Sequence, residues 1–536
     1  MTEPRRRALS AAAILTGAIL AVGLTSPAIA APEQTTGGHG DKGSAVLRKA
    51  VTADNIAKHL AALQKIADRN GGTRSAGTAG HVQSAEYIEQ QLHRAGYQTE
   101  RQPFSYDKIN LDLAEFSQVT PTATDYVLQE QFYPMDYTGE GTVDGATVQA
   151  VDLNLEGDRA STSGCEAEDF AGFTAGNVAL IQRGSCDFAT KAANAEAAGA
   201  VGVVIFNQGN DVPGDDRFGV ILGTLGAVGA TIPVLGTSFE IGEALAADPA
   251  TTVRIAVETT TTTIDTFNLI AKTKKGDPTK QVVVGAHLDS VAEGPGINDN
   301  GSGSATILEV AIQLAKTKSK VGNQIVFAWW SGEEDGLQGS NYYVSQLTDE
   351  QAANTALNLN FDMVGSPNSV NFVYDGDGDA FGEAGPEGSA EIEAVFNDYF
   401  ASQGIPTAPT AFDGRSDYFG FINAGIPAGG LFTGAEGIKT DEEAATFGGT
   451  AGEPYDPCYH QACDTTQNVD KVVLEKMADA VAHAVYVYGN VRNHPGHGGH
   501  HGGHGNWGHG NGHGDWGWGW GNGNGHGDKG DRWGGK

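Results

Sequence analysis

Positively charged residues are scarce in this sequence of 536 residues. Lysine and arginine together number 33, against 66 aspartates and glutamates, which gives a formal net charge of −33. A surface with this excess of negative charge repels polyanions, so nucleic acids and anionic membranes are poor partners for the chain. The excess suits solubility and the binding of cations.

Long hydrophobic runs are absent beyond the first thirty residues, so we expect no membrane span in the mature chain. The early run from Ala8 to Leu24 follows the basic stretch Arg5 to Arg7 and precedes the small-x-small sequence Ala28-Ile29-Ala30. This layout is typical of a cleaved signal peptide over residues 1–30, and it predicts a secreted, extracellular protein. The alternative, a membrane anchor, would need a longer apolar span.

Cysteine is rare, with four in the whole chain. An even number of cysteines in an exported protein predicts disulfide bonds. Three pairings are formally possible, and proximity in the sequence favours Cys165 with Cys186 and Cys458 with Cys463.

Two common catalytic motifs are also missing. The sequence has no Gly-x-Ser-x-Gly elbow and no Gly-Lys-Ser/Thr loop, which argues against a serine hydrolase and a nucleotide-binding protein. The run Asp375-Gly376-Asp377-Gly378-Asp379 resembles a calcium loop but lacks the later glycine and glutamate of an EF-hand, so we interpret it as a turn.

Apolar strands alternate with helical patterns in the second half of the chain. Strands are expected at Val282 to Ala286, Ile325 to Trp330 and Leu357 to Phe361, with a helix from Ser302 to Lys316 between the first two. Near the N-terminus, Thr52 can cap a further amphipathic helix. The alternation predicts an α/β fold with a mainly parallel sheet sandwiched by helices.

The middle of the chain has a different texture. From about Thr120 to Thr263 short β-rich runs dominate, and Val178 to Asn207 is a strand, helix and strand that indicate a βαβ unit. The threonine run Thr259 to Thr263 is expected to be the exit from this inserted module. We therefore divide the chain into a discontinuous α/β domain (45–118 and 264–492), an inserted β-rich α+β domain (119–263) and a tail (493–536).

The tail is composed mainly of Gly, His, Trp, Asn and Asp, and this composition cannot form a packed core. We expect a disordered segment. It either chelates transition metals weakly or serves as a solubilising extension.

Acidic residues and histidines follow the predicted strands of the α/β domain. They are His287 and Asp289 after the first strand, Asp299 before the next helix, Glu333 and Glu334 after the second strand, Asp362 after the third, and His460 in a loop between Cys458 and Cys463. Each alone is weak evidence, since such residues are usually turns or solvated surface. Functional residues of open α/β sheets gather at the carboxyl ends of strands, so we expect this set to converge.

The chemistry of the set suits zinc. Two imidazoles and three carboxylates (His287, Asp299, Glu334, Asp362 and His460) can hold a pair of zinc ions, which accept nitrogen and oxygen ligands. Zinc brings the pKa of bound water down to about 7, as hydrolysis at neutral pH requires.

From about Ala45 to Phe116 and from Thr266 to Asn490, the chain resembles the secreted bacterial two-zinc leucyl aminopeptidases, and the intervening module resembles a protease-associated (PA) domain. The matching strings are Gly285-Ala286-His287-Leu288-Asp289-Ser290, Gly296-Ile297-Asn298-Asp299-Asn300-Gly301-Ser302-Gly303, Ser331-Gly332-Glu333-Glu334 and Asp456-Pro457-Cys458-Tyr459-His460. The resemblance spans nearly all of the chain between the signal peptide and the tail.

The resemblance implies a role for each site residue. His287 and Asp362 would bind one zinc ion, Glu334 and His460 the other, and Asp299 would bridge them. Glu333 would be the general base, and Tyr459 would donate a hydrogen bond to the developing oxyanion. From its position two residues beyond His287, Asp289 is expected to accept the other N–H of that ligand and fix its tautomer.

By the same resemblance, the peptide bond after Asp299 would be cis. The free amine of the substrate would contact Glu333, Asp362 and the backbone carbonyl of Arg415. For the Arg415 side chain, the alternative is an ion pair with Asp413 or Asp417. Some relatives bind a stabilising calcium ion, for which no ligands can be assigned here.

The sequence thus predicts a monomeric zinc aminopeptidase that removes N-terminal residues, large apolar ones such as leucine by the resemblance, from peptides with a free N-terminus. The PA domain would limit substrate length or contact substrates. The alternatives are a carboxypeptidase or a glutaminyl cyclase on the same fold, or a non-catalytic receptor-like homologue. A carboxypeptidase would need basic residues around the site, a cyclase would use a single zinc, and a receptor-like protein would have broken ligands.

Overall fold

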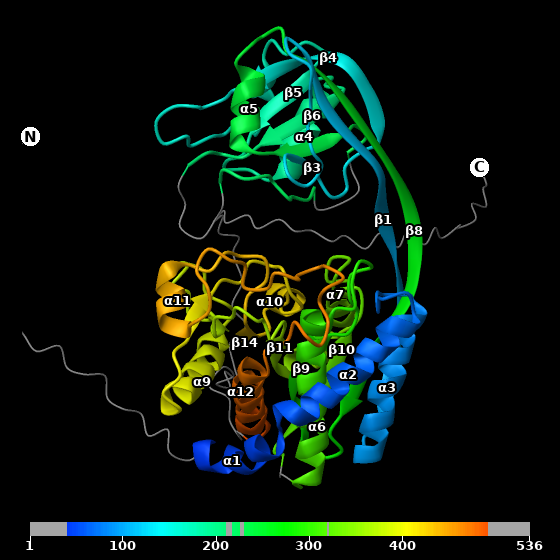
Figure 1. The fold of residues 1–536 in the computed structure, drawn as a ribbon, viewed down its shortest axis with the longest axis vertical. Helices are drawn as coiled ribbons and strands as arrows, with labels where there is room; N and C mark the ends of the chain where they lie inside the picture. Colours follow the sequence, from blue (N-terminus) through cyan, green and yellow to red (C-terminus); the bar gives the residue numbers. More distant parts are fainter. Residues whose placement is uncertain (1–39, 211–216, 226–229, 319–320, 491–536) are drawn as a thin grey trace, which may run out of the picture.

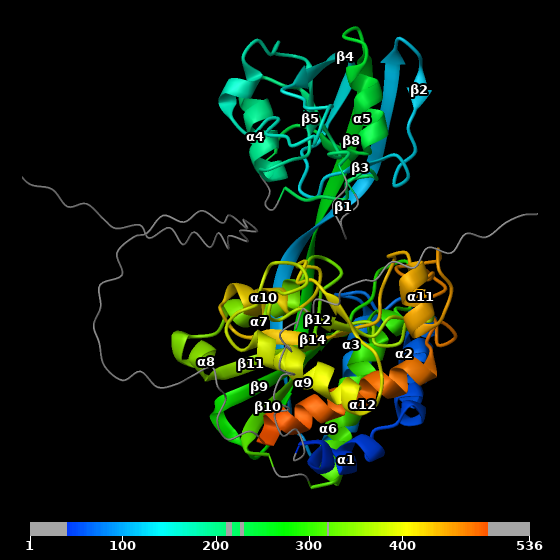
Figure 2. The same cartoon turned by 90° about the vertical axis from the view of Figure 1, so that its left-hand side faces the viewer.

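The computed structural model describes residues 40–210, 217–225, 230–318 and 321–490. The predicted signal peptide and the predicted tail lie outside these described residues. The described chain forms two modules, one above the other in Figure 1, and the view in Figure 2 shows the same separation. The large module combines segments from before and after the small one.

A two-stranded ribbon joins the modules. Strands β1 (Thr99–Thr120) and β8 (Thr252–Lys272) are antiparallel over almost their whole length, from Thr99 opposite Ala271 to Thr120 opposite Thr252 (Figure 1). The threonine run at 259–263 lies inside β8, which leaves the small module as an extended strand of the kind that β-branched side chains favour. Both edges of the predicted inserted domain therefore fall within this ribbon.

The sheet of the large module has parallel strands at its centre. Strand β9 lies between β10 and β11, β11 also pairs with β14, and these pairs are all parallel; β8 and β12 add antiparallel pairs at either side. The bounds are β9 Asp277–His287, β10 Asn323–Trp330, β11 Thr355–Phe361, β12 Phe372–Tyr374, β13 Ala408–Thr410 and β14 Ala428–Phe432. The unbroken apolar runs are explained by burial of the central strands on both faces.

Helices cover both faces of this sheet. Val282 and Val284 of β9 belong to a core shared with α2, α6 and α12, whereas Val283 belongs to a second core shared with α7 and α10. The helices of the large module are α1 Gly40–Ala50, α2 Ala53–Arg69, α3 Ala79–Ala95, α6 Gly303–Lys316, α7 Gln338–Ser345, α8 Asp349–Asn354, α9 Ser389–Ser402, α10 Phe419–Asn423, α11 Asp441–Phe447 and α12 Lys471–Asn490. Thr52 caps α2 as predicted, with its hydroxyl accepting the N–H of Asn55. No helix among the described residues combines the length and apolarity needed to cross a bilayer.

The small module contains the predicted βαβ unit, made of β5, α4 and β6. Strands β4, β5, β6 and β7 are parallel in this order, and β3 pairs antiparallel with β7. The bounds are β2 Thr124–Asp125, β3 Phe132–Pro134, β4 Gly141–Val151, the 3₁₀ helix η1 Ala167–Phe170, β5 Val178–Gln182, α4 Phe188–Ala197, β6 Gly202–Phe206, β7 Val234–Thr237 and α5 Phe239–Ala246.

Each module contains one disulfide. Cys165 is bonded to Cys186 in the small module, with the Cα atoms 5.8 Å apart, and Cys458 is bonded to Cys463 in the large module, with the Cα atoms 5.3 Å apart. These are the pairings that proximity in the sequence favours.

Candidate active site

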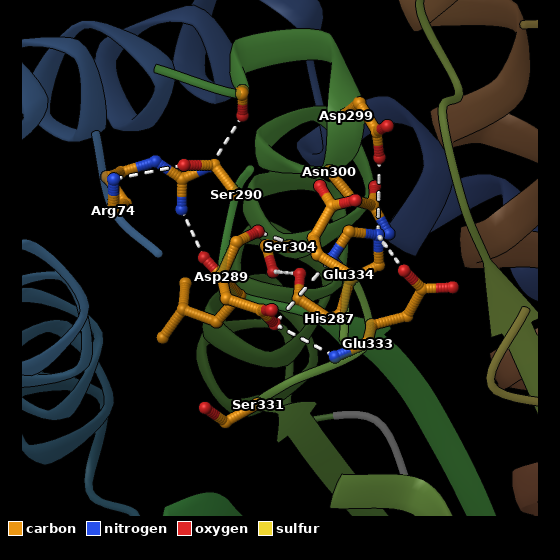
Figure 3. A network of polar contacts seen from close by, with 12 residues as sticks. Arg74, His287, Asp289, Ser290, Asp299, Asn300, Ser304, Ser331, Glu333 and Glu334 are labelled. Carbon is orange, nitrogen blue, oxygen red and sulfur yellow. Dashed lines mark hydrogen bonds and ion pairs between the residues drawn. The ribbon is translucent and has the colours of Figure 1, made fainter. Parts of the chain in front are cut away.

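The site lies where the central strands of the large module end. His287 is the last residue of β9, Asp362 follows β11, and Glu333 and Glu334 lie in the loop after β10. Asp299 lies on the short segment η2 (Ile297–Ser302), whose backbone is not helical at Asp299 and Asn300 and which leads into α6. Figure 3 shows His287, Asp299, Glu333 and Glu334 pointing toward one another from these elements. Parallel strands present their carboxyl ends on one edge, which explains the convergence.

The two histidines face the two oxygens of one carboxylate. His287 Nε2 lies 3.2 Å from Asp299 Oδ1, and His460 Nε2 lies 3.2 Å from Asp299 Oδ2. His287 Nε2 is also 3.2 Å from Asp362 Oδ1, and His460 Nε2 is 3.0 Å from Glu334 Oε2. The structure therefore brings all five predicted ligands together, in two groups that meet at Asp299.

Negative charge is crowded in this site. Burial and the nearby Asp299 raise the pKa of Glu334 to about 8. Burial, together with Asp362 and Asp417, also raises the pKa of Glu333 well above its ordinary value, against the opposing effect of His287. Carboxyl groups held this close in a buried site need positive counter-charge to stay ionised.

The donor set fits divalent metal ions. Ligand atoms of His287, Asp299 and Glu334 lie within 4.8 Å of one another, as do those of His287, Glu333 and Asp362. Glu334 Oε1 is buried without a hydrogen-bond partner among the described residues, as expected for an atom that awaits an ion. Imidazole nitrogens and carboxylate oxygens are ligands that zinc accepts.

Asp289 contacts His287 differently from the prediction. His287 Nδ1 lies 3.2 Å from the backbone carbonyl of Asp289 and 3.8 Å from its carboxylate Oδ1. The carbonyl is thus the better placed acceptor. The carboxylate instead faces the next strand end, 3.5 Å from the backbone N of Glu333 (Figure 3).

A buried arginine, which was not predicted, holds the loop after β9. Arg74 is fully buried, and its guanidinium donates to the carbonyls of Leu288, Pro295 and Gly296. Burial lowers the pKa of Arg74 to about 10, although surrounding carboxylates oppose this shift. The one sequence signal was an arginine inside the glycine-rich turn between α2 and α3.

Two more acids, also missed from the sequence, hold the Asp299 segment. Asp464 accepts the backbone N–H groups of Asn298 at 2.8 Å and of Asp299 at 3.0 Å, and Asp456 Oδ2 accepts from the Asn298 side chain at 2.6 Å. The Cys458–Cys463 disulfide lies between these two acids in the chain. The peptide bond between Asp299 and Asn300 is cis.

Tyr459 and Arg415 lie together at the edge of the site. The Arg415 guanidinium donates to the Tyr459 hydroxyl oxygen at 3.3 Å, and the Tyr459 ring stacks on His460 with 3.8 Å between centroids. The ion-pair partner of Arg415 is Glu436 at 2.8 Å, and neither of the predicted partners takes this place. Asp413 accepts the backbone N–H of Arg415 instead.

The acidic run at Asp375 is a turn, in agreement with the sequence. The Asp375 carboxylate accepts backbone N–H groups from Gly378, Ala380 and Phe381, so its oxygens are already engaged. Ligand atoms of Asp375, Asp377 and Asp379 lie within 4.8 Å of one another, and Asp377 and Asp379 are exposed.

The chain is similar to proteins of known families. A model of peptidase family M28 matches residues 268–485, and a model of the PA domain matches residues 145–245. An aminopeptidase from Pseudomonas aeruginosa (strain PAO1) is 47% identical over 438 residues, which cover 81% of each chain. The chain belongs to peptidase family M28. This M28 peptidase carries a PA domain as the small module, and the predicted fold class is confirmed.

The chain is also similar to other proteins that are named aminopeptidases. Leucine aminopeptidase 2 from Trichophyton rubrum is 46% identical over 333 residues, which cover 61% of this chain and 65% of the fungal one. The solved aminopeptidase from Aneurinibacillus sp. strain AM-1 matches with a TM-score of 0.64 and 26% identity, covering 84% of this chain and 98% of the other. A zinc aminopeptidase from Bacillus subtilis matches with a TM-score of 0.54 and 25% identity, covering 82% and 96%.

The ribbon contacts the loop after β10 in this M28 peptidase. Tyr106 of β1 donates to Asp335 Oδ2 at 2.5 Å, and Lys108 Nζ lies 2.6 Å from Asp335 Oδ1. From β8, the Thr266 hydroxyl lies 2.7 Å from that of Ser331. Both strands that carry the PA domain therefore also hold the loop with Glu333 and Glu334.

Proposed function

We propose that this M28 peptidase is a secreted zinc aminopeptidase, which releases N-terminal residues, leucine and other large apolar ones, from peptides. The placement of both histidines on the two oxygens of Asp299 carries the proposal, because one carboxylate shared by two nitrogen ligands suits a pair of metal ions. The names of the relatives support the aminopeptidase activity and the use of zinc.

Each zinc ion would have its own ligands. His287 and Asp362 would hold one ion, Glu334 and His460 the other, and Asp299 both. When bound, zinc supplies Lewis acidity and makes a water molecule acidic enough to react at neutral pH. The short contacts within each proposed group support this division.

The remaining side chains have separate tasks in peptide hydrolysis. Glu333 would take a proton from the attacking water and deliver it to the leaving amine. Tyr459 would donate its hydroxyl hydrogen to the carbonyl oxygen of the scissile bond as negative charge develops there. Because Arg415 donates to the Tyr459 oxygen, that hydrogen remains free for the substrate.

Recognition of the free amine follows from the charge of the site. Glu333, Asp362 and the backbone carbonyl of Arg415 would surround the substrate ammonium. An acidic surrounding favours an ammonium over a carboxylate, which supports an aminopeptidase over a carboxypeptidase.

Further parts of the proposal concern the chain as a whole. The early hydrophobic run and two disulfides support secretion. We retain the division into 45–118 with 264–492 and 119–263, and a monomeric state.

A panel of aminoacyl anilides, assayed with a zinc count on the purified protein, tests this function. We expect turnover with apolar first residues, no turnover of N-acetylated peptides, and two zinc ions per chain. Efficient cleavage of N-acetylated peptides, or release of C-terminal residues, would contradict the proposal.

A further inference from the structure

A large cleft lies between the M28 module and the PA domain. Its volume is about 880 Å³, near the upper end of the range for ligand sites. Glu334 and Arg415 line it on one side, and Tyr133, Met135 and Leu222 line it on the other. The cleft is therefore continuous with the proposed catalytic site and has room for more than one residue of a peptide.

Two exposed leucines line this cleft. Leu222 of the PA domain is 72% exposed and Leu111 of the ribbon is 37% exposed. Single exposed apolar side chains are normal on a protein surface, but apolar side chains that share one concave site with an active centre are typical of ligand binding.

The segment that carries Leu222 is firmly held. The carbonyl of Gly223 accepts the N–H of Asp136 at 2.9 Å, and the N–H of Leu225 donates to the carbonyl of Asp136 at 2.9 Å. A Cβ atom on Gly223 would lie 2.7 Å from Met135 Sδ and 2.8 Å from the Phe188 ring, so a larger residue would displace these side chains. Leu222 is thus presented to the cleft from an anchored backbone.

The charges of the cleft also restrict its occupant. Of the three cations in the lining, Lys108 is paired with Asp335 and Arg415 with Glu436. The third, Arg183, donates to the side chain of Asn207 at 3.3 Å. Glu293 lies in the same lining and is exposed. An occupant with apolar side chains fits this surface better than an acidic one.

We propose that Leu222 and Leu111 form a subsite for an apolar side chain of the peptide that remains after the first residue is released. This inference rests on the proposed aminopeptidase function and extends it to substrate positions beyond the scissile bond. The PA domain thereby selects among peptides by their downstream sequence, while the M28 module selects the first residue.

Peptides with a leucine at the first position and glycines after it test the subsite, with one phenylalanine moved along the glycine positions. For the parent protein, kcat/KM should rise by about tenfold when phenylalanine reaches one particular position, the effect of burying one large apolar side chain. The variant Leu222→Asp should lose this rise, and Leu222→Ser should lose most of it. Hydrolysis of leucine anilide should stay unchanged, because it has no residues beyond the scissile bond.

The control is Val127→Asp, at a PA-domain residue that is 49% exposed and does not line the cleft. This variant should keep the preference of the parent. The subsite is refuted by a parent protein without any positional preference, by equal loss on anilide and peptides in Leu222→Asp, or by the same loss in Val127→Asp. Failure of the parent to hydrolyse leucine anilide would instead refute the aminopeptidase function.

Discussion

In both modules parallel strands end at one edge of a sheet, but the side chains at that edge are ionisable in the M28 module and neutral amides in the PA domain. In the M28 module, β9 ends in His287 and β11 is followed by Asp362, and these side chains face each other at 3.2 Å. In the PA domain, β5 ends in Gln182 and β6 is followed by Asn207. Gln182 accepts the N–H of Asn154 and donates to the carbonyls of Asn154 and Gln208.

This difference in side chains explains why a metal site is proposed in the M28 module and not at the PA strand ends. The neutral amide of Gln182 is satisfied by backbone groups, so it stabilises the neighbouring loops and has no oxygen or N–H left for a ligand. Charged groups at the M28 strand ends face one another and need an ion between them. Both modules therefore bring strand ends together at one sheet edge, and the side chains at that edge decide whether a ligand can bind there.

The largest expected effect is a loss of hydrolysis when the M28 site is changed, with no such loss when a PA strand end is changed. Glu333→Gln keeps the shape of the side chain and removes the base, so leucine anilide hydrolysis should fall by about 10² to 10⁴-fold. Zinc content, measured by atomic emission, should match the parent.

The matched control is Gln182→Ala at the end of a PA strand. It removes satisfied hydrogen bonds and should lower the stability of the PA domain while leaving anilide turnover near that of the parent. Loss of zinc in Glu333→Gln would show that Glu333 is a ligand and that its assignment as the base is wrong.

The next effect concerns two buried basic residues whose pKa burial lowers, His81 of the M28 module and Lys191 of the PA domain. Burial, with a smaller contribution from Arg74, lowers the pKa of His81 to about 3. Both ring nitrogens of His81 lack a hydrogen-bond partner among the described residues. Between about pH 6.5 and 3 the unfolded chain binds this proton and the folded chain does not, so stability falls by up to about 1.4 kcal/mol per pH unit as pH decreases. His81→Leu should remove this acid sensitivity in denaturant titrations of the M28 module.

Lys191 should make the stability of the PA domain depend on pH in the alkaline range, whereas His81 acts in the acid range. Burial lowers its pKa to about 8, and its ammonium donates to the Ser163 carbonyl at 2.5 Å. Between about pH 8 and 10.5 the unfolded chain holds the extra proton, so stability of the PA domain should rise with pH there. Lys191→Met should abolish the alkaline gain and leave the acid loss unchanged. For the acid range, a His81→Leu variant that still loses as much stability on acidification as the parent would show that groups other than His81 cause the loss.

The sequence reveals the side chains that converge at the candidate site better than the groups that hold them. His287, Glu333, Glu334 and Asp362 could be predicted because each follows an apolar run that is itself a strand signal. Arg74 could not, since it contacts the carbonyl of Leu288, 214 residues further along the chain. Contacts across such distances depend on the folded topology, which local patterns do not encode.

The fold shows the same division. The α/β alternation, the βαβ unit and the cap at Thr52 are local features, and the structure contains them. The long ribbon was not predicted, because β1 and β8 are stabilised by pairing with each other across the whole PA domain. Its polar threonines gave no apolar alternation that would distinguish a strand from a linker.

The smallest expected effect concerns this ribbon, whose two ends differ in what they touch. At the M28 end, Lys108 and Tyr106 bind the partly buried Asp335, next to Glu334. At the PA end, Arg254 pairs with Glu115 in solvent. Lys108→Met and Tyr106→Phe should each lower kcat several-fold to about tenfold with little change in KM, because small displacements of a catalytic group are costly. Steady-state kinetics with leucine anilide give both constants.

Arg254→Gln is the control for the ribbon, since exposed ion pairs contribute about 0 to 1 kcal/mol to stability and this pair is far from the loop. It should leave both constants at the parent values. Lys108→Arg should restore most of kcat, because it returns a cation to Asp335. If Lys108→Met raises KM and leaves kcat intact, Lys108 contacts substrate in the cleft and does not position the loop. Equal kcat losses in Lys108→Met and Arg254→Gln would mean that the ribbon acts through its overall stability, and the two ends would then be equivalent.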